Sequence, residues 1–183
     1  PHTIAGIIGL FTSFINNNEF YTLKICNTLL VFLSGIVMYK LLLKLFNNKN
    51  ISLLGSIFYI TMPYFMTNIY VRTAFNESFM YLFMPMILIG IVDLLNKNYK
   101  SFYIYFILGY IGIINSHLVL SVYFTFIVLI VLLINYKKIL KKENIKRLII
   151  SSILILILVM PSVIMMLEHK ALNIYTVFDS NAM

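Results

Sequence analysis

Charged residues are scarce in this chain of 183 residues: they make up 11% of it, and six residues are acidic. A water-soluble globular protein contains about 25% charged residues. Hydrophobic residues reach 61%, and the mean hydropathy is +0.95. Several uncharged stretches approach or exceed the roughly 18–20 residues that cross the hydrocarbon core of a bilayer. Because these stretches recur along the whole chain, a signal peptide cannot explain them. The sequence predicts an integral membrane protein, with the lipid bilayer as a partner.

Cysteine pairs, metal-binding clusters and nucleotide-binding motifs are also missing. The single cysteine, Cys26, lies in an apolar run, so it has no disulfide partner in the chain and is expected to be a small buried residue. The sequence contains no cluster of metal ligands, no glycine-rich phosphate loop and no Ser-His-Asp arrangement. These patterns predict no metal site and leave the catalytic residues unknown. The chain opens with "PHTIAGIIGL", without an initiator methionine, and we expect it to be a fragment of a longer protein.

The chain consists of apolar segments separated by short polar ones. We expect an all-α fold, a polytopic transmembrane bundle that forms a single domain. Its membrane helices, about six in number, are expected at residues 21–46, 51–70, 74–95, 102–114, 118–134 and 145–167. Residues 1–19 are expected to form an outer interfacial segment, 20–167 the bundle and 168–183 an outer tail. Within the first segment, residues 4–15 are too few to cross the bilayer and are expected to form an interfacial helix.

Three prolines predict where these helices kink or end, and one pair of charges predicts an ion pair on a helix face. Pro63 is expected to kink or end the second helix, and Pro85 to interrupt the third, because proline lacks the backbone N–H that a helix interior uses. Pro161 lies near the end of the last helix. Asp93 and Lys97 are four residues apart in the order that favours an ion pair on one helix face.

The longest uncharged stretch, residues 101–136, predicts a helical hairpin. As one helix it would be about 54 Å long, against a hydrocarbon core of about 30 Å. Lysines flank both of its ends, and two basic flanks on one side of a membrane require an even number of crossings. The turn is expected at Asn115, Ser116 and His117. The first helix of the pair, residues 102–114, would then be short, and its turn is expected below the outer surface in a polar cavity.

The basic residues predict which loops lie inside. Alternating crossings place eleven of the 14 lysines and arginines on one side, as the positive-inside rule requires for the cytoplasm. These residues are Lys40, Lys44, Lys49, Lys97, Lys100, Lys137, Lys138, Lys141, Lys142, Lys146 and Arg147. Lys24, Arg72 and Lys170 remain outside. The net charge of +8 is therefore explained by loop anchors rather than by a nucleic-acid surface, and no nucleic-acid partner is expected.

The stretch "YVRTAFNES", residues 70–78, holds two opposite charges on the expected outer face. Two interpretations are open. In the first, Arg72 and Glu77 form an interfacial pair at the start of the third helix, with Asn76 or Thr73 as the N-cap and the carboxylate near the positive end of the helix dipole. Alternatively, an arginine fork beside free backbone N–H groups is suited to bind a phosphate or pyrophosphate.

His117 has the same two interpretations. A histidine at a hairpin turn commonly contacts interfacial water or a neighbouring carbonyl group. Here it lies in a polar group with Asn115, Ser116 and Ser121, on the same expected face as Arg72. That arrangement is equally consistent with a ligand-binding cavity at membrane depth, where irregular backbone is tolerated only if it is buried in protein or lines water.

Several stretches resemble one bacterial family of integral membrane proteins, labelled 6-pyruvoyl-tetrahydropterin synthase-related. They are "LKICNTLLVFLSGIVMYKLL", "YITMPYFMTNIYVRTAFNESFMYLFMPMILIGI", "INSHLVLSVYFTFIVL" and "LVMPSVIMMLEHK". The most specific part is an arginine followed by a glutamate five residues later and a proline in the next helix, here Arg72, Glu77 and Pro85. Ser116 and His117 at the hairpin turn are the second matching point. The resemblance covers roughly residues 1–170.

Despite that label, members of the family are similar to GT-C glycosyltransferases, which use polyprenyl-phosphate-linked sugars at the outer membrane face. The resemblance implies transfer of a sugar from such a donor to an extracytoplasmic acceptor, after a carboxylate deprotonates the acceptor hydroxyl. Arg72 would stabilise the leaving phosphate, Glu77 would hold Arg72 or bind a divalent cation, and His117 would contact sugar or phosphate. The supporting residues would be Asn76, Ser116 and Tyr70.

The resemblance also implies where the protein works and what the fragment lacks. It indicates a multi-pass protein of a bacterial cell membrane and cell envelope. GT-C enzymes carry their usual catalytic carboxylate in the first outer loop, which this chain does not include, so we expect the isolated fragment to be inactive. A non-enzymatic alternative stays open: a transporter, flippase or scaffold subunit that handles lipid-linked substrates, because broken helices and polar clusters are typical of those proteins too.

Overall fold

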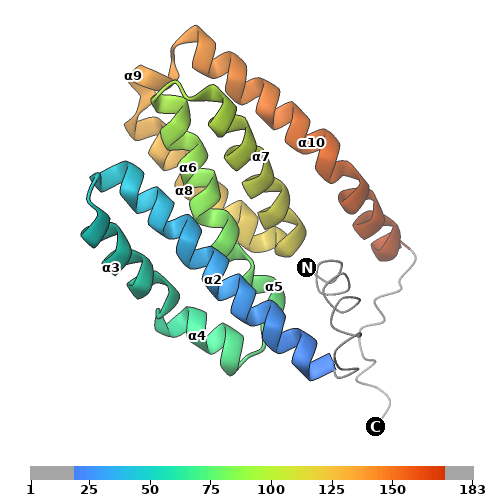
Figure 1. The fold of residues 1–183 in the computed structure, drawn as a ribbon. Helices are drawn as coiled ribbons and strands as arrows, with labels where there is room; N and C mark the ends of the chain where they lie inside the picture. The colour runs from blue at the N-terminus through green and yellow to red at the C-terminus, as the bar shows by residue number, and fades with distance from the viewer. Residues whose placement is uncertain (1–18, 172–183) are drawn as a thin grey trace.

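The computed structural model describes residues 19–171, and these form a bundle of helices (Figure 1). The expected interfacial helix at 4–15 and most of the expected tail at 168–183 lie outside the described residues. The helices are α2 (Glu19–Phe46), α3 (Lys49–Ile60), α4 (Pro63–Tyr70), α5 (Phe75–Ser78), α6 (Met80–Leu95), α7 (Tyr99–Ser116), α8 (Leu118–Ile134), α9 (Tyr136–Ile139) and α10 (Lys142–Ala171). The all-α bundle predicted from the sequence is confirmed.

The turn after α2 shows how a short polar segment reverses the chain. Asn47 adopts a positive φ of 51°, a conformation that asparagine tolerates better than most residues. The side chain of Asn48 then accepts hydrogen bonds from the backbone N–H groups of Asn50 and Ile51, and so caps α3. As a result α3 packs back along α2, which it follows in the sequence (Figure 1).

The two prolines of this region act differently. Pro63 ends the helix that precedes it, as predicted: α3 stops at Ile60 and α4 starts at Pro63. Pro85 was expected to interrupt its helix, and that prediction is wrong, because α6 continues through it. The missing N–H of Pro85 would leave the carbonyl oxygen of Tyr81 without its helical partner. The hydroxyl of Tyr59 donates a hydrogen bond of 2.9 Å to that oxygen instead.

The centre of the bundle is the contact between α6 and α7. Ile87, Leu94, Phe102 and Ile113 are fully buried there. Glycines allow the two backbones to approach closely: a Cβ atom at Gly90 would lie 2.9 Å from the backbone nitrogen of Phe106. Small residues at such contacts are the usual means by which membrane helices pack, because lipid provides no hydrophobic drive between them.

The helical hairpin is confirmed, with one correction. α7 ends at Ser116 and α8 begins at Leu118, so His117 is the break between them. However, α7 contains 18 residues rather than the 13 expected. Its length is therefore about 27 Å by the usual helical rise. Since that nearly matches the hydrocarbon core, helix length no longer indicates a turn below the outer surface.

Three described helical segments are long and apolar enough to cross a membrane: Thr22–Phe46, Phe75–Leu95 and Lys142–Met165. α8 is apolar but shorter, with 17 residues. The expected helix at 51–70 is divided into α3 and α4, which have 12 and eight residues. Many large apolar side chains face outward on α8 and α10, among them Ile130, Leu133 and Leu156, as expected for helices in contact with lipid.

The two ends of the bundle differ in charge. The α2–α3 turn, the α6–α7 turn, α9 and the start of α10 lie at one end, and these segments, with the helix ends beside them, carry the eleven basic residues predicted to share a side (Figure 1). We call this the basic end. The turn between α4 and α5 and the break at His117 lie at the other end. Which end faces the cytoplasm stays a prediction from the positive-inside rule.

Asp93 does not pair with Lys97 as expected. Lys97 lies past the end of α6 with a positive φ of 61°, so the two residues do not share a helix face. The carboxylate of Asp93 is 2% exposed and forms a salt bridge with Lys44 of α2. It also accepts a hydrogen bond from the hydroxyl of Ser101 in α7. One carboxylate therefore connects three helices near the basic end.

Candidate functional site

The stretch between α4 and α6 forms a tight turn. The backbone N–H groups of Arg72 and Ala74 donate to the carbonyl oxygens of Thr67 and Asn68, both at 2.8 Å. Between them Thr73 adopts a positive φ of 48°, which is uncommon for a β-branched residue. The short helix α5 starts directly after this turn. Its N-cap is Ala74, without a side-chain hydrogen bond, so the expected capping by Asn76 or Thr73 does not occur.

Arg72 and Glu77 form a two-pronged ion pair across this turn. One guanidinium nitrogen, Nη1, donates to Oε2 of Glu77 at 3.2 Å, and Nη2 donates to Oε1 at 3.4 Å. Paired hydrogen bonds of this kind fix the orientation of both groups. The side chain of Glu77 is 20% exposed and that of Arg72 is 47% exposed. The carboxylate is therefore the more enclosed partner.

Two residues of α4 complete the network. Nη1 of Arg72 also donates to Oδ1 of Asn68 at 3.0 Å and to the hydroxyl oxygen of Tyr64 at 3.2 Å. Asn68 and Tyr64 in turn donate to Oε2 of Glu77, at 3.4 and 3.3 Å. The hydrogen bond to Tyr64 and the charge of Glu77 raise the pKa of Arg72 above its ordinary value. Arg72 therefore stays charged, and Glu77 is held by three donors.

Sequence reasoning missed Tyr64 and Asn68, although a signal was present. Tyr64, Asn68 and Arg72 follow one another at intervals of four, the spacing that places side chains on one face of a helix. Asn68 is fully buried. On the neighbouring face of α4, Phe65 stacks on Tyr81 of α6, with ring centroids 4.1 Å apart. That contact attaches α4, and with it the network, to the central helix of the bundle.

A hollow of about 360 Å³ adjoins the network. It is lined by the turn, by the first residues of α5 and by His117 from the break between α7 and α8: the lining residues are Thr73, Ala74, Phe75, Asn76, Glu77 and His117. His117 lies in extended backbone between α7 and α8, and its Nδ1 accepts a hydrogen bond of 3.4 Å from the backbone N–H of Leu120. Its ring is therefore oriented by the start of α8.

The structure brings together some of the predicted site residues and not others. Glu77, Asn76 and His117 share the hollow, although they come from distant parts of the sequence. Arg72 contacts the hollow indirectly, through Glu77. Ser116 is buried, and its hydroxyl donates to the carbonyl oxygen of Gly112 at 2.7 Å. Tyr70 is 74% exposed and belongs neither to the lining of the hollow nor to the network.

This arrangement can bind polar groups of a ligand rather than a metal ion alone. Among residues 19–171, no group of three or more His, Cys, Asp or Glu side chains is placed to hold a metal. A single carboxylate can still share a divalent ion with the phosphate of a ligand, as magnesium sites commonly do. An oriented imidazole and a fixed carboxylate around one hollow are also suited to bind the hydroxyl groups of a sugar.

Comparison with known proteins places the chain in a family. The family model described as dolichyl-phosphate-mannose-protein mannosyltransferase matches residues 1–165. No curated protein and no solved structure matches the chain. The match confirms the glycosyltransferase-like part of the resemblance seen in the sequence. The link to the pterin-labelled bacterial family stays a prediction.

Proposed function

Because the chain belongs to the dolichyl-phosphate-mannose-protein mannosyltransferase family, and is thus a membrane glycosyltransferase-like domain of a family that uses polyprenyl-phosphate sugar donors, we propose that it takes part in sugar transfer to an extracytoplasmic acceptor. The sugar site in this proposal is the hollow between the α4–α5 turn and His117. The observation that carries it is the meeting of Glu77 and His117, two residues singled out from the sequence, around one hollow of about 360 Å³.

The location of the hollow supports this function. It lies at the end of the bundle away from the basic end. The positive-inside rule assigns the basic end to the cytoplasm and therefore the end with the hollow to the outer face. The hollow also adjoins the start of the span Phe75–Leu95, where the headgroup region of the bilayer begins. A polyprenyl-phosphate donor has its phosphate and sugar at that depth and its chain among the lipids. The hollow is therefore accessible to the reactive end of such a donor.

In the proposed reaction, a carboxylate removes the proton of the acceptor hydroxyl, and the hydroxyl oxygen forms a bond to the anomeric carbon of the sugar. The bond between that carbon and the phosphate oxygen breaks, and polyprenyl phosphate leaves with the electron pair. Of the two roles considered for Glu77, holding Arg72 agrees with their paired hydrogen bonds. Because three donors already hold its carboxylate, Glu77 is better suited to bind a sugar hydroxyl than to act as the base.

The guanidinium group of Arg72 can donate further hydrogen bonds besides those to Glu77. Its side chain is 47% exposed, so the face away from Glu77 is open to a phosphate oxygen. An arginine that is oriented before the donor binds can stabilise the charge that develops on the leaving phosphate. His117, which lines the same hollow, completes the proposed site. No described residue is proposed as the base that removes the acceptor proton.

The experiment measures transfer of radiolabelled mannose from a polyprenyl-phosphate-mannose donor, with membranes that contain matched amounts of the full-length protein. We expect Arg72→Lys to lower transfer by about 10²-fold, because lysine cannot form the paired hydrogen bonds and loses a preorganised donor. We expect Glu77→Gln to cause a loss of similar size, since the fork then has no charged partner. His117→Ala should reduce transfer as well.

Tyr70→Phe is the matched control, because it changes an exposed residue of the same stretch that is outside the hollow and the network. It should transfer mannose at the wild-type rate. Wild-type transfer by both Arg72→Lys and Glu77→Gln would contradict the proposed site. A full-length protein that binds the donor but transfers no sugar under any condition would favour the alternative of a transporter or scaffold.

A further inference from the structure

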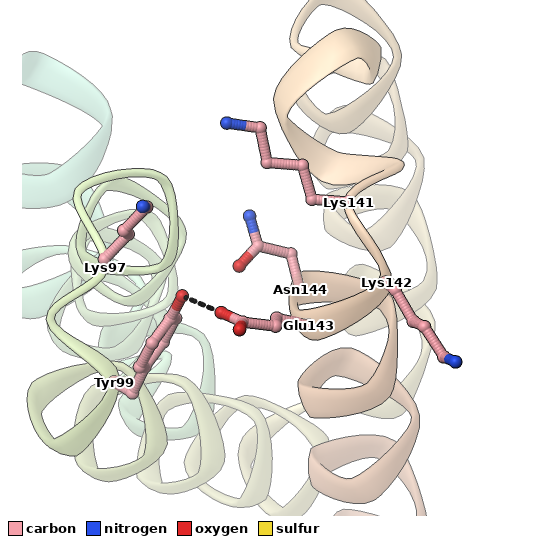
Figure 2. Close-up of a pocket in the computed structure, with 6 residues that line it drawn as sticks. All are labelled: Lys97, Tyr99, Lys141, Lys142, Glu143 and Asn144. Carbon is pink, nitrogen blue, oxygen red and sulfur yellow. Dashed lines mark hydrogen bonds between the residues drawn. The ribbon is translucent and has the colours of Figure 1, made fainter.

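A second polar pocket lies at the basic end, far from the site described above. Its volume is about 260 Å³, and it lies between the α6–α7 turn and the start of α10 (Figure 2). The residues that line it are Lys97, Tyr99, Lys141, Lys142, Glu143 and Asn144. Even without Lys142, the charges of Lys97 and Lys141 exceed that of Glu143 and give the lining a net positive charge, so the pocket favours an anion. Figure 2 shows that Lys97 and Lys141 extend toward the pocket from opposite walls, whereas Lys142 extends away from it.

A second observation, independent of the charge of the lining, indicates a ligand: the buried side chain of Asn144 has an unpaired oxygen. Asn144 is 4% exposed, and Figure 2 shows its side chain directed from α10 into the space between Lys97 and Lys141. Its Nδ2 donates to the carbonyl oxygen of Lys138 at 2.9 Å, which fixes the orientation of the amide. Its Oδ1 accepts no hydrogen bond from any described residue. A buried polar atom without a partner costs free energy, so this oxygen is suited to accept a hydrogen bond from a ligand.

A hydrogen bond joins the wall that carries Tyr99 to the start of α10. The hydroxyl of Tyr99 donates to Oε2 of Glu143 at 3.1 Å, as the dashed line in Figure 2 shows, which connects the start of α7 to the start of α10. The guanidinium group of Arg147 stacks on the Tyr99 ring, with its carbon 3.5 Å from the ring centroid. The positive charge of Arg147 beside this wall offsets the negative charge of Glu143, which would otherwise oppose an anion.

The pocket lies at the depth of the lipid headgroups. Lys97 follows the end of the span Phe75–Leu95 by two residues, and Lys142 is the first residue of the span Lys142–Met165. The next turns of α10 expose apolar side chains such as Ile149 and Ile153, along which an acyl chain can lie. Basic pockets between membrane helices at this depth are typical binding sites for anionic lipid headgroups. The volume, below the 300–1,000 Å³ or so of common ligand pockets, fits a small headgroup.

We propose that this pocket binds one anionic phospholipid whose headgroup carries a free hydroxyl, with the chemistry of phosphatidylglycerol. Lys97 and Lys141 contact the phosphate from two sides. The headgroup hydroxyl donates a hydrogen bond to Oδ1 of Asn144. The bound lipid joins the α6–α7 turn to α10, and so stabilises the position of α10 against the rest of the bundle. The proposal does not depend on the activity proposed above.

The test uses the purified chain in a neutral detergent, titrated with phosphatidylglycerol and analysed by native mass spectrometry. We expect one lipid to be retained per chain. The double variant Lys97→Gln/Lys141→Gln should weaken retention by about thirtyfold, since each lysine near an anionic lipid contributes about 1 kcal/mol and the variant removes two. Lys142→Gln removes the same charge from a side chain that extends away from the pocket, and it should bind as the wild type does. Unchanged elution and melting without lipid confirm that the variants fold.

Two further probes separate the parts of the proposal. Phosphatidylethanol has the same charge but no headgroup hydroxyl, and we expect about threefold to tenfold weaker retention, the effect of one lost hydrogen bond. Equal retention of both lipids would overturn the role of Asn144. Equal weakening by Lys142→Gln and by the double variant would overturn the pocket. If sn-glycerol 3-phosphate binds with the same lysine dependence and phosphatidylglycerol is not retained, the ligand is a soluble phosphate and the lipid assignment is wrong.

Discussion

At the scale of residues, the carboxylates of Asp93 and Glu77 are each held by a cation and by neutral donors. Asp93 contacts Lys44 and Ser101, and Glu77 contacts Arg72, Tyr64 and Asn68. A charge that leaves water is costly unless a partner and further hydrogen bonds compensate it. Where the chain keeps a carboxylate away from its ends, it therefore also provides a cation and neutral donors from other helices.

The contact between Lys44 and Asp93 gives a prediction of stability. Lys44→Met should leave the buried carboxylate without its cation and lower the free energy of unfolding by about 2 kcal/mol. That value is below the 3–5 kcal/mol of a fully buried pair, because the Lys44 side chain is 32% exposed. The double variant Lys44→Met/Asp93→Leu should regain most of this loss, since it removes both charges. Thermal unfolding in detergent provides the measurement.

Lys40→Met is the control for that experiment, because it removes a lysine of the same helix that is exposed. It should melt close to the wild type. If Lys44→Met melts there too, the ion pair contributes nothing measurable. If the double variant is less stable than Lys44→Met, the carboxylate stabilises the bundle through Ser101 rather than through the lysine.

At the scale of elements, apolar runs predicted the helices well and their interruptions less well. A run of apolar residues must be a helix in a bilayer, because every backbone group needs a partner within the segment. That argument located α2, α8 and α10 within a few residues. It could not predict that α6 passes Pro85 intact, since the hydroxyl that binds the free carbonyl oxygen comes from Tyr59, on another helix. Tertiary contacts of that kind leave no pattern in the local sequence.

The contact between α6 and α7 gives a prediction for glycine. Gly90→Ala would bring a Cβ within 2.9 Å of the backbone nitrogen of Phe106, and backbone cannot move as a flexible side chain can. We expect it to lower the free energy of unfolding by about 1–3 kcal/mol, the usual cost of overpacking. Gly35→Ala is the matched control: its Cβ would lie 3.3 Å from a terminal carbon of Ile60, which can move aside. Equal melting temperatures for the two variants would refute the close approach.

At the scale of the whole molecule, the sequence predicted that the polar residues of the candidate site share a face, but not how they contact one another. Counting basic residues put Arg72 and His117 on one face, and Glu77, which pairs with Arg72, lines the same hollow as His117. The sequence could not predict which of the two charged residues lines the hollow. Glu77 lines it, and Arg72 contacts Glu77 without lining it. The pocket around Asn144 was not predicted either, because its walls come from two turns that are more than 40 residues apart and meet only in the folded chain.

The last prediction concerns the orientation of the whole bundle. In a Cys26→Ala background, cysteines introduced singly within 47–50, 97–100 and 137–146 should resist a membrane-impermeant thiol reagent in intact cells, because the excess of lysines holds that end in the cytoplasm. Tyr70→Cys should react, since Tyr70 is 74% exposed at the opposite end. After cells are opened, all of these cysteines should react, which controls for burial. If Tyr70→Cys is protected in intact cells and the basic end reacts, the hollow faces the cytoplasm. Transfer at the outer face would then be excluded, whereas the lipid pocket, defined by its depth and charge, would still stand.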